Sequence, residues 1–451
     1  MDNKKHMAVF SIIKKSELEG AKRLDAEYYQ PEYLDITSKL KNARAIKTLA
    51  SDIRYGLYVE PDYLDEGINF IRAMNTTNFW VDGEVLKISN KKVPSDYFLH
   101  AGDCLIVRSG ANTGLVSVIY PRLEGSTFGS YTIRIRFDKV NPFFASVFLN
   151  TRYGFLQTLR SQTGAAQPNL NIPNIKEIKI PVISEHQQKD IEKRCIEIER
   201  ARIQSEILYS QAENLLLEEL GLKDFTEEQS LYTAVNFSEL KESCRMDAEY
   251  FQLKYRKIYS LIRENKGITL GEIATLKKGF EPGSEAYQED GKLFIRVSSV
   301  SKDGITEKDQ KYLKNDLYQK LKKNYQPKVG EILLTKDASP GIAYAVKESI
   351  EGVISGGVLR VKINEDVESE YLTLCINSKI GQSQVERDAG GSIIKHWKPE
   401  QVKSMLIPIL PKPTQQEIAK LVRKSHEARK KAKELLEEAK RAVETLIERQ
   451  Q

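Results

Sequence analysis

Two long segments of the chain carry apolar or small residues at alternating steps of three and four, the spacing of one helix face. The first runs from about Glu185 to Leu220 and the second from about Thr414 to the C-terminus. The stripes consist of Ile191, Cys195, Ile198, Ser205, Leu208, Ala212 and Leu215, with Arg202 inside the series, and of Ile418, Leu421, Val422, Ser425, Ala432, Leu435, Ala439, Val443 and Leu446. Lys, Arg and Glu occupy the other faces, a pattern typical of coiled coils.

The second segment has a plausible start signal. Pro413 and Thr414 precede the stripe, and Glu417 lies three residues after Thr414, which predicts a capping box. At 1.5 Å per residue each helix is expected to be roughly 50 Å long, longer than most helices inside globular domains. We therefore predict that the two helices pack against each other.

The chain before each long helix has a different pattern of apolar and polar residues. Short apolar or alternating runs of strand length occur at 105–107, 115–119, 131–137 and 358–363, and glycines punctuate the first half. Each half is therefore predicted to be mixed α and β, with mostly strands in its middle.

The sequence also repeats itself. Residues 16–30 return 222 positions later as residues 238–252, with nine of fifteen positions identical and no gap. Phe70-Ile-Arg72 matches Phe294-Ile-Arg296, and the run 180–183 followed by Gln187-Gln188 matches the run 407–410 followed by Gln415-Gln416. Two copies of about 225 residues are too long for solenoid repeats and indicate a tandem duplication.

The fold class predicted is α+β: a tandem duplication of a mixed α/β domain, each copy followed by a long helix, with the helices paired as an antiparallel coiled coil. The boundaries predicted are 1–184 for the first domain, 185–222 for its helix, 223–413 for the second domain and 414–451 for its helix. Length alone suggests about three domains, and the repeat replaces that division with two equal units.

Composition narrows the class of protein. With 40% apolar and 29% charged residues the chain is ordinary for a globular protein. No stretch approaches the roughly 18 apolar residues of a membrane span, and the run 7–13 is too short for a secretory signal; a cytoplasmic location without membrane contact is expected. The four cysteines and five histidines lack disulfide or metal-ligand spacing, so no metal site is expected. The net charge of +6 leaves room only for a local basic surface.

Motifs for catalysis are missing. The sequence has no phosphate-binding loop, dinucleotide fingerprint, nucleophile elbow or His-Glu-x-x-His zinc motif, and it contains no Pro-Pro as part of an amino-methyltransferase tetrapeptide. The acids of the repeated Arg-x-Asp-Ala-Glu-Tyr motif could suggest acid or base chemistry. A structural helix, in which Arg and Asp pair while Tyr28, Tyr33, Tyr250 and Tyr255 pack, explains them better. An enzyme is therefore not expected.

The ordered motifs resemble a known family. The Leu-Asp-Ala-Glu-Tyr-Tyr start, the Gly102-Asp-x-Leu-Ile-x-Arg108-x-Gly strand and loop, the segment 163–170 (Thr-Gly-Ala-Ala-Gln-Pro-Asn-Leu), and Ile-Pro followed by Gln-Gln are together similar to the specificity subunit of type I restriction-modification systems. The resemblance covers essentially the whole chain.

The resemblance implies a non-catalytic reader of double-stranded DNA. Each of two target-recognition domains reads one half of a bipartite site, and the helices set the spacer between the halves. Two methyltransferase subunits, and further restriction or translocase subunits, are the implied partners. S-adenosylmethionine and ATP are implied on those partners, and no cofactor is expected on this chain. The alternative from architecture alone is a coiled-coil scaffold with two protein-binding domains.

Candidate DNA contacts follow from the resemblance and from side-chain chemistry. The loop 108–114 combines a cation, an amide and hydroxyls with glycines that allow close backbone approach, and 336–341 is its counterpart. The candidates are Arg108, Ser109, Asn112, Thr113, Gln167, Asn169, Lys336, Ser339, Lys395 and His396. A purely structural hairpin remains the alternative for the loop. The segment 163–167 is matched only loosely by 389–392, so a shared role for Gln167 is not implied.

Two further pairs of residues have structural interpretations. Arg72 and Arg296 follow a Phe-Ile run in both halves, so they are predicted to be structural or to face phosphates. Trp80 and Trp397 are predicted to pack in the core or under a loop.

Overall fold

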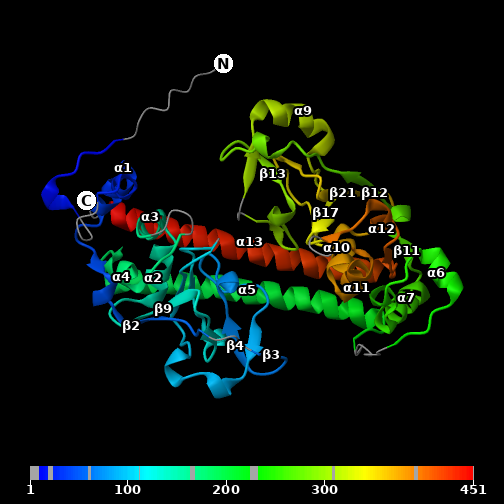
Figure 1. Ribbon diagram of the computed structural model, residues 1–451, viewed down its shortest axis with the longest axis horizontal. Coiled ribbons are helices and arrows are strands. Elements are labelled where there is room, and N and C mark those ends of the chain that lie inside the picture. The colour runs from blue at the N-terminus through cyan, green and yellow to red at the C-terminus, as the bar shows by residue number, and fades with distance from the viewer. Residues whose placement is uncertain are drawn as a thin grey trace. The chain divides into compact units, whose positions relative to one another are not determined.

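The structure, a computed structural model, describes residues 10–18, 24–58, 62–110, 112–162, 168–223, 232–306, 310–390 and 395–449 (Figure 1). Contacts divide it into two compact units. Unit 1 comprises the described residues up to Ala201 and those from Lys431 onward, and unit 2 comprises Arg202–Lys430. The long helices α5 (Glu185–Glu219) and α13 (Lys412–Glu448) each contribute residues to both units.

Unit 1 is built on two four-stranded sheets, and β1 pairs with β10 in a separate two-stranded sheet. The first is antiparallel, in the order β2-β9-β6-β7, and the second has the order β3-β5-β4-β8, with β4 parallel to β8. The strands are β1 Arg44–Ala45, β2 Ala50–Tyr55, β3 Tyr63–Leu64, β4 Ile68–Ile71, β5 Leu86–Ile88, β6 Cys104–Val107, β7 Val116–Val118, β8 Thr127–Phe128, β9 Thr132–Phe137 and β10 Lys179–Ile180. The shorter helices are α1 Pro31–Lys39, α2 Pro142–Leu149, α3 Arg152–Arg160 and α4 Ile172–Glu177.

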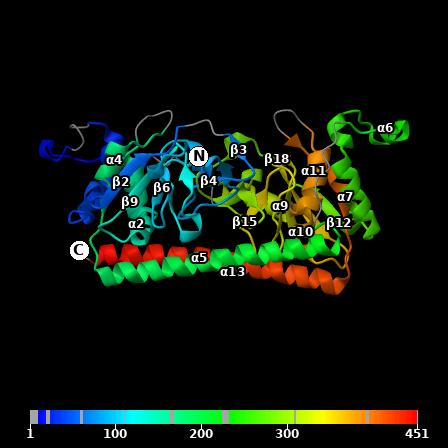
Figure 2. The ribbon, with the colours of Figure 1, turned by 90° about the horizontal axis from the view of Figure 1, so that it is seen from below.

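Alternation along the strands gives the first sheet two buried faces, because successive side chains of a strand point to opposite sides. Cys104 and Ile106 of β6 belong to the main core with α1, α2, α3 and the unit 1 parts of α5 and α13. Leu105 packs instead in a separate cluster with Ile71 and Phe128 of the second sheet. Figure 2 shows β2, β6 and β9 lying along one side of the long helices within this unit.

Unit 2 has the same plan. Its main sheet has the order β12-β21-β17-β19 and is antiparallel, and β13 pairs in parallel with β20 beside it. The strands are β11 Ile268–Thr269, β12 Ala274–Lys278, β13 Lys292–Ile295, β14 Val300–Ser301, β15 Gly304–Ile305, β16 Lys311–Leu313, β17 Ile332–Thr335, β18 Asp337–Ala338, β19 Ala343–Ala345, β20 Gly352–Ile354, β21 Val358–Ile363, β22 Lys395–His396 and β23 Leu406–Ile407. The helices are α6 Phe237–Ser243, α7 Leu253–Glu264, α8 Leu270–Ile273, α9 Asn315–Tyr325, α10 Ser369–Asn377, α11 Lys379–Asp388 and α12 Pro399–Lys403.

The strand β2 and its counterpart β12 are each followed by a glycine at a close backbone crossing. A Cβ on Gly56 would lie 2.2 Å from the carbonyl oxygen of Gly129, and one on Gly279 would lie 2.2 Å from that of Ser355. No side chain fits at such distances. Glycine is therefore required where the chain passes from the first sheet toward the second.

A glutamine anchors the start of each long helix. The Gln188 side chain donates to the Ile183 carbonyl at 3.0 Å and accepts from the Asn141 amide at 2.8 Å. Gln415 does the same with the Leu410 carbonyl at 2.9 Å and the Glu368 amide at 3.3 Å. Gln188 therefore corresponds to Gln415, one position away from the alignment of Gln187-Gln188 with Gln415-Gln416 that the sequence suggested.

The capping box predicted at Thr414 and Glu417 is wrong. Helix α13 begins at Lys412, so Pro413 and Thr414 already lie in its first turn. Proline is tolerated there because the amides of the first turn have no helical partner. A reciprocal cap occurs at the start of α5 instead, where Ser184 and Gln187 exchange hydrogen bonds between side chain and backbone.

The two long helices run against each other within each unit. In unit 1, Ile191, Cys195 and Ile198 of α5 share the core with Ala432, Leu436, Ala439 and Val443 of α13. In unit 2, Ala212 and Leu216 of α5 share the core with Ile418 and Val422. The fully buried residues include Leu216, Leu436 and Ile447 rather than the predicted Leu215, Leu435 and Leu446, which are half-buried. The stripe is wider than a two-helix seam because each long helix also contributes to the cores that it shares with the shorter helices and strands of the units.

A pair of hydroxyls is buried between the helices in unit 2. The oxygens Oγ of Ser205 and Ser425 are 3.1 Å apart, and the Ser425 hydroxyl donates to the Ser205 carbonyl at 2.7 Å. Both residues are almost fully buried. A buried polar pair of this kind favours one register of a helix pair, since sliding the helices would leave the hydroxyls without partners.

The repeated Arg-x-Asp-Ala-Glu-Tyr motif is not one continuous helix, contrary to the prediction. It forms the 3-10 turns Ala26–Tyr29 and Ala248–Phe251, and the extended residues Gln30 and Gln252 separate these turns from α1 and α7. The predicted ion pair is present in unit 2, where Arg245 and Asp247 are 2.5 Å apart. Arg23, its counterpart, lies outside the described residues. The motif packs as predicted in one respect, because Tyr33 and Tyr255 are buried.

Candidate nucleic-acid interface

In unit 1 the end of β6 is tied to a distant segment of the chain. The Arg108 amide donates to the Tyr131 carbonyl at 2.9 Å, and the Arg108 carbonyl accepts from the Leu170 amide at 2.8 Å. Ser109 forms an isolated antiparallel bridge with Asn169. Three of the predicted contact residues, Arg108, Ser109 and Asn169, are therefore neighbours in space.

Two arginines of unit 1 lie over tyrosine rings. The Arg108 guanidinium carbon is 4.6 Å from the centre of the Tyr55 ring, and that of Arg72 is 5.9 Å from the Tyr63 ring. Stacking on an aromatic face orients the planar guanidinium while leaving its charge in place. A pre-oriented arginine of this kind suits either a phosphate or the acceptor edge of guanine.

Other candidates of unit 1 hold the loop itself. The Thr113 hydroxyl donates to the Gly110 carbonyl at 2.6 Å and lies 3.4 Å from the Pro168 carbonyl. The Asn112 amide donates to the Ala73 carbonyl at 3.4 Å. Gly110 and Gly114 both have φ of 94°. These bonds fit the hairpin interpretation for Asn112 and Thr113, whereas Gln167 lies outside the described residues.

Unit 2 repeats the arrangement in which the residue after the core strand is bonded to a distant segment, and we call this arrangement the backbone frame. The Lys336 amide donates to the Gly357 carbonyl at 2.9 Å, and the Lys336 carbonyl accepts from the Trp397 amide at 2.8 Å. Strands β18 and β22 then pair Asp337 with His396 and Ala338 with Lys395. The segment 395–397 thus corresponds to 168–170, and it brings the predicted residues Lys336, Lys395 and His396 together.

The side chains on this frame differ from those of unit 1. The Asp337 carboxylate is 2.5 Å from Lys336 Nζ and 2.8 Å from His396 Nδ1. Burial favours the neutral acid, but the hydrogen bonds from Lys336 and His396 outweigh it and lower the pKa of Asp337. Lys336 is only 8% exposed, so its charge is directed to Asp337 and not to solvent.

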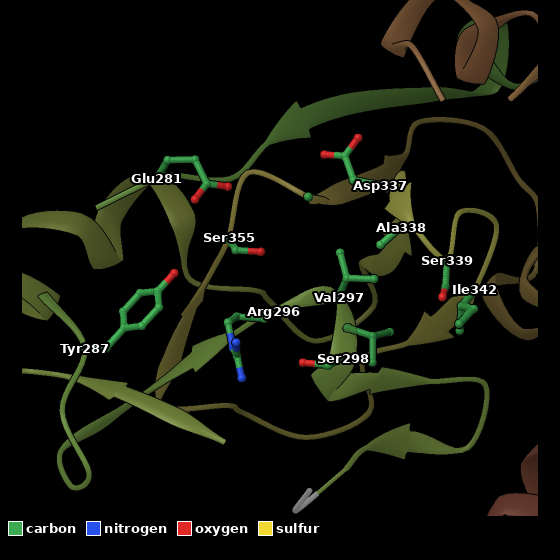
Figure 3. Close-up of a pocket in the computed structure, with 12 residues that line it drawn as sticks. Glu281, Tyr287, Arg296, Val297, Ser298, Asp337, Ala338, Ser339, Ile342 and Ser355 are labelled. Carbon is green, nitrogen blue, oxygen red and sulfur yellow. The ribbon is translucent and has the colours of Figure 1, made fainter. Parts of the chain in front are cut away.

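An open depression of about 570 Å³ adjoins the Asp337 side chain. Its polar lining comes from Glu281, Tyr287, Arg296, Ser298, Asp337, Ser339 and Ser355 (Figure 3). Ser339, a predicted contact, faces it, and its carbonyl also accepts from the Thr335 hydroxyl at 2.6 Å. Arg296, predicted to be structural or phosphate-facing, lies at the end of β13 on the opposite side of the lining.

The candidates predicted from the sequence do not include Tyr55 and Asp337. Tyr55 lies on β2, more than fifty residues before Arg108, and no local pattern links the two. Asp337 does follow Lys336 directly, at the position that corresponds to Ser109. Comparison of these two positions in the repeat could have drawn attention to the carboxylate.

Within the residues that the structure describes, no group of three or more His, Cys, Asp or Glu side chains could hold a metal ion. No helix in the described ranges is long and apolar enough to cross a membrane.

Comparison with known proteins finds a family match over part of the chain. Residues 263–439 match the family described as the type I restriction modification DNA specificity domain. The match places a type I restriction modification DNA specificity domain within residues 263–439. The matched part of the specificity domain runs from α7 into α13 and includes Lys336, Asp337 and His396.

Several solved structures are distantly similar to this chain. The type I restriction-modification S subunit from M. genitalium is 14% identical, with a TM-score of 0.41, over 90% of this chain and 94% of that chain. The HsdS subunit from Thermoanaerobacter tengcongensis is 13% identical, with a TM-score of 0.28, over 90% and 95%. The type IIG restriction endonuclease BpuSI is 13% identical, with a TM-score of 0.30, over 46% and 35%. No curated protein matches the chain. The assignment rests on the family match.

Proposed function

We propose that this chain is the non-catalytic DNA-sequence specificity subunit of a type I restriction-modification complex. Its two halves, a tandem duplication with the domain and helix boundaries predicted above, each read one half of a bipartite site. The long helices pair as an antiparallel coiled coil and set the spacer. The chain docks two methyltransferase subunits, and restriction or translocase subunits join them. S-adenosylmethionine and ATP belong to those partners, and this chain needs no cofactor.

One observation carries the proposal. Both units use the same hydrogen-bonded frame, in which the residue after the core strand is bonded to a distant segment, yet they hold different side chains on it. Unit 1 presents Arg108 stacked on Tyr55, and unit 2 presents Asp337 bonded to Lys336 and His396. A common frame with different polar side chains suits the reading of two different half-sites, because base identity is read by hydrogen bonds to base edges.

The coiled coil is supported by contacts inside each unit. In unit 1, Nη1 of Arg194 in α5 lies 4.0 Å from Oε2 of Glu438 in α13. In unit 2, the hydroxyl oxygens of Ser205 and Ser425 are 3.1 Å apart. Residue numbers rise along one helix as they fall along the other, as an antiparallel pair requires. The partner subunits are proposed from the family resemblance.

DNA binding tests the proposal directly. The full-length chain, mixed with the methyltransferase subunit of the same system, is expected to select duplexes with two short defined sequences and an undefined spacer from a random library. Its preference over random duplex should persist at moderate salt, since contacts to phosphates alone give affinity without sequence preference. Equal binding of all duplexes would contradict the proposal, and a coiled-coil scaffold for proteins would select no duplex.

Helix length is expected to determine the spacer. Deleting one heptad from each long helix shortens it by about 10 Å, and this corresponds to roughly 3 base pairs at 3.4 Å per pair. The preferred spacer should shorten by that amount, and a heptad inserted in both helices should lengthen it. A deletion in one helix alone is the control, because it takes the buried stripes out of alignment. An unchanged spacer in the matched variants would exclude the role of the helices.

A further inference from the structure

The open depression of unit 2 combines hydrogen-bond acceptors and donors. Carboxylates come from Glu281, after β12, and from Asp337 in β18, while Arg296 and the serines 298, 339 and 355 supply donors. Figure 3 shows Glu281 and Asp337 on one side of the depression and Arg296 on the other. Such a lining is unusual for a surface that approaches DNA, because carboxylates repel phosphates.

The Asp337 carboxylate is held in one orientation. One oxygen accepts from Lys336 Nζ at 2.5 Å and the other from His396 Nδ1 at 2.8 Å. A carboxylate offers about four acceptor positions, so each oxygen retains capacity for another hydrogen bond. The side chain is therefore a fixed acceptor beside the depression and not a mobile surface charge.

The corresponding positions of unit 1 hold no carboxylate. The bridge of Ser109 with Asn169 matches that of Asp337 with His396, so Ser109 corresponds to Asp337. The bridge of Leu57 with Gly129 matches that of Phe280 with Ser355, which makes Tyr58 the counterpart of Glu281. The carboxylate acceptors Glu281 and Asp337 are therefore specific to unit 2, whereas the backbone frame is common to both units.

Base chemistry limits what a fixed carboxylate can read. In the major groove the hydrogen-bond donors are the amino groups of cytosine N4 and adenine N6, and Asp and Glu pair with cytosine N4. The guanine opposite that cytosine presents the acceptors O6 and N7, which arginine recognises. A depression with Asp337 on one side and Arg296 on the other therefore complements a G·C pair.

We propose that this depression reads the N4 amino group of a cytosine in the half-site bound by unit 2, with Asp337 as the acceptor. The inference rests on the proposed function and deepens it, because it names a specificity-determining residue and its base. Glu281 keeps phosphates away from the depression, and Arg296 contacts the guanine of the same pair.

Selection from a random duplex library tests the inference. The wild-type chain with its methyltransferase subunit is expected to require cytosine at one position of one half-site. Asp337→Asn should lower the preference for cytosine at that position about 10-fold and raise that for adenine, because an amide pairs with adenine N6 and N7. Asp316→Asn, at an exposed position in the first turn of α9, is the matched control, and it should leave this half-site unchanged.

A second measurement uses the wild-type protein with a modified duplex, so it does not require a variant to fold. The wild-type complex is expected to bind a duplex with N4-methylcytosine at that position about 10-fold more weakly, since the methyl group is placed against the carboxylate. A bipartite preference that tolerates N4-methylcytosine at each cytosine of both half-sites would overturn the inference and leave the proposed function intact. Likewise, an Asp337→Asn protein that is folded and keeps the wild-type half-site would overturn it. Failure of the wild-type complex to select any duplex would instead overturn the proposed function.

Discussion

Replacing Arg360 with alanine is expected to lower the free energy of unfolding of unit 2 by about 3–5 kcal/mol, the cost of leaving one member of a buried ion pair alone. Arg360, in the middle of β21, donates to both oxygens of Glu331 at 2.7 and 2.6 Å and to the Asn324 carbonyl at 2.8 Å. Both charged side chains are under 10% exposed. Urea denaturation followed by fluorescence measures the loss, and a Trp80→Phe background leaves Trp397 of unit 2 as the reporter.

The decrease in the free energy of unfolding caused by Arg360→Ala should depend on pH. Burial favours neutral Glu331, but hydrogen bonds from Arg360 and the Lys328 amide outweigh it and lower the pKa of this carboxyl. A lowered pKa contributes stability above the pKa of the unfolded state, about 4.3, and that stability is lost as pH falls through the folded value. The difference between wild type and Arg360→Ala should therefore be largest near neutral pH and should narrow in acid, where Glu331 becomes neutral in the variant.

Two further variants distinguish the effect of breaking the ion pair from the effect of burying its charges. Lys311→Ala removes a partner of Glu289, which is 91% exposed, and it should cost no more than about 1 kcal/mol. The double variant Glu331→Leu with Arg360→Met removes both charges and should recover most of the stability lost in the single variant. Equal losses for Arg360→Ala and Lys311→Ala would contradict a buried, structurally important pair.

Replacing Trp397 with alanine is expected to destabilise unit 2 by about 3–5 kcal/mol, the usual cost of deleting a large buried aromatic side chain. Trp397 is fully buried in the main core of the unit. Its amide also bonds to Lys336, so the variant should loosen the segment that carries His396. Hydrogen exchange of the β17 and β21 amides measures the stability, and library selection measures the accompanying loss of the unit 2 half-site.

Trp397→Phe is the matched control. No hydrogen-bond partner for the indole Nε1 lies among the residues that the structure describes. The phenyl ring should therefore retain most of the stability, with a loss of about 1 kcal/mol from the smaller volume. If alanine and phenylalanine had the same small effect, the core role of Trp397 would be refuted.

Regular periodicity made the main elements predictable. The apolar runs 131–137 and 358–363 correspond to β9 (Thr132–Phe137) and β21 (Val358–Ile363), and the first long stripe corresponds to α5 (Glu185–Glu219). In these segments the buried face repeats often enough to outweigh local variation. The interpretation of Trp80 and Trp397 as packing residues also agrees with their burial.

Other features depended on contacts between segments distant in sequence. The break at Gln30 and Gln252 follows from backbone angles that no spacing of tyrosines reveals. Leu216 is buried in the core that α5 shares with α13 and with other elements of unit 2, whereas Leu215 is only half-buried beside it. In the candidate interface, bridges across about sixty residues pair Ser109 with Asn169 and Asp337 with His396. The sequence identified Ser109, Asn169 and His396 as candidates, but it did not reveal these pairings or the part of Asp337 in them.

The buried hydroxyls of Ser205 and Ser425 have a consequence for how the length of this molecule can change. A helix pair that must keep these two residues opposite each other cannot absorb an insertion of one or two residues, because the hydroxyls and the apolar stripes would rotate away from their partners. Whole heptads restore the arrangement, and each adds about 10 Å. The length of the helix pair can therefore change only in steps of whole heptads. A point mutation cannot change this length by a smaller amount.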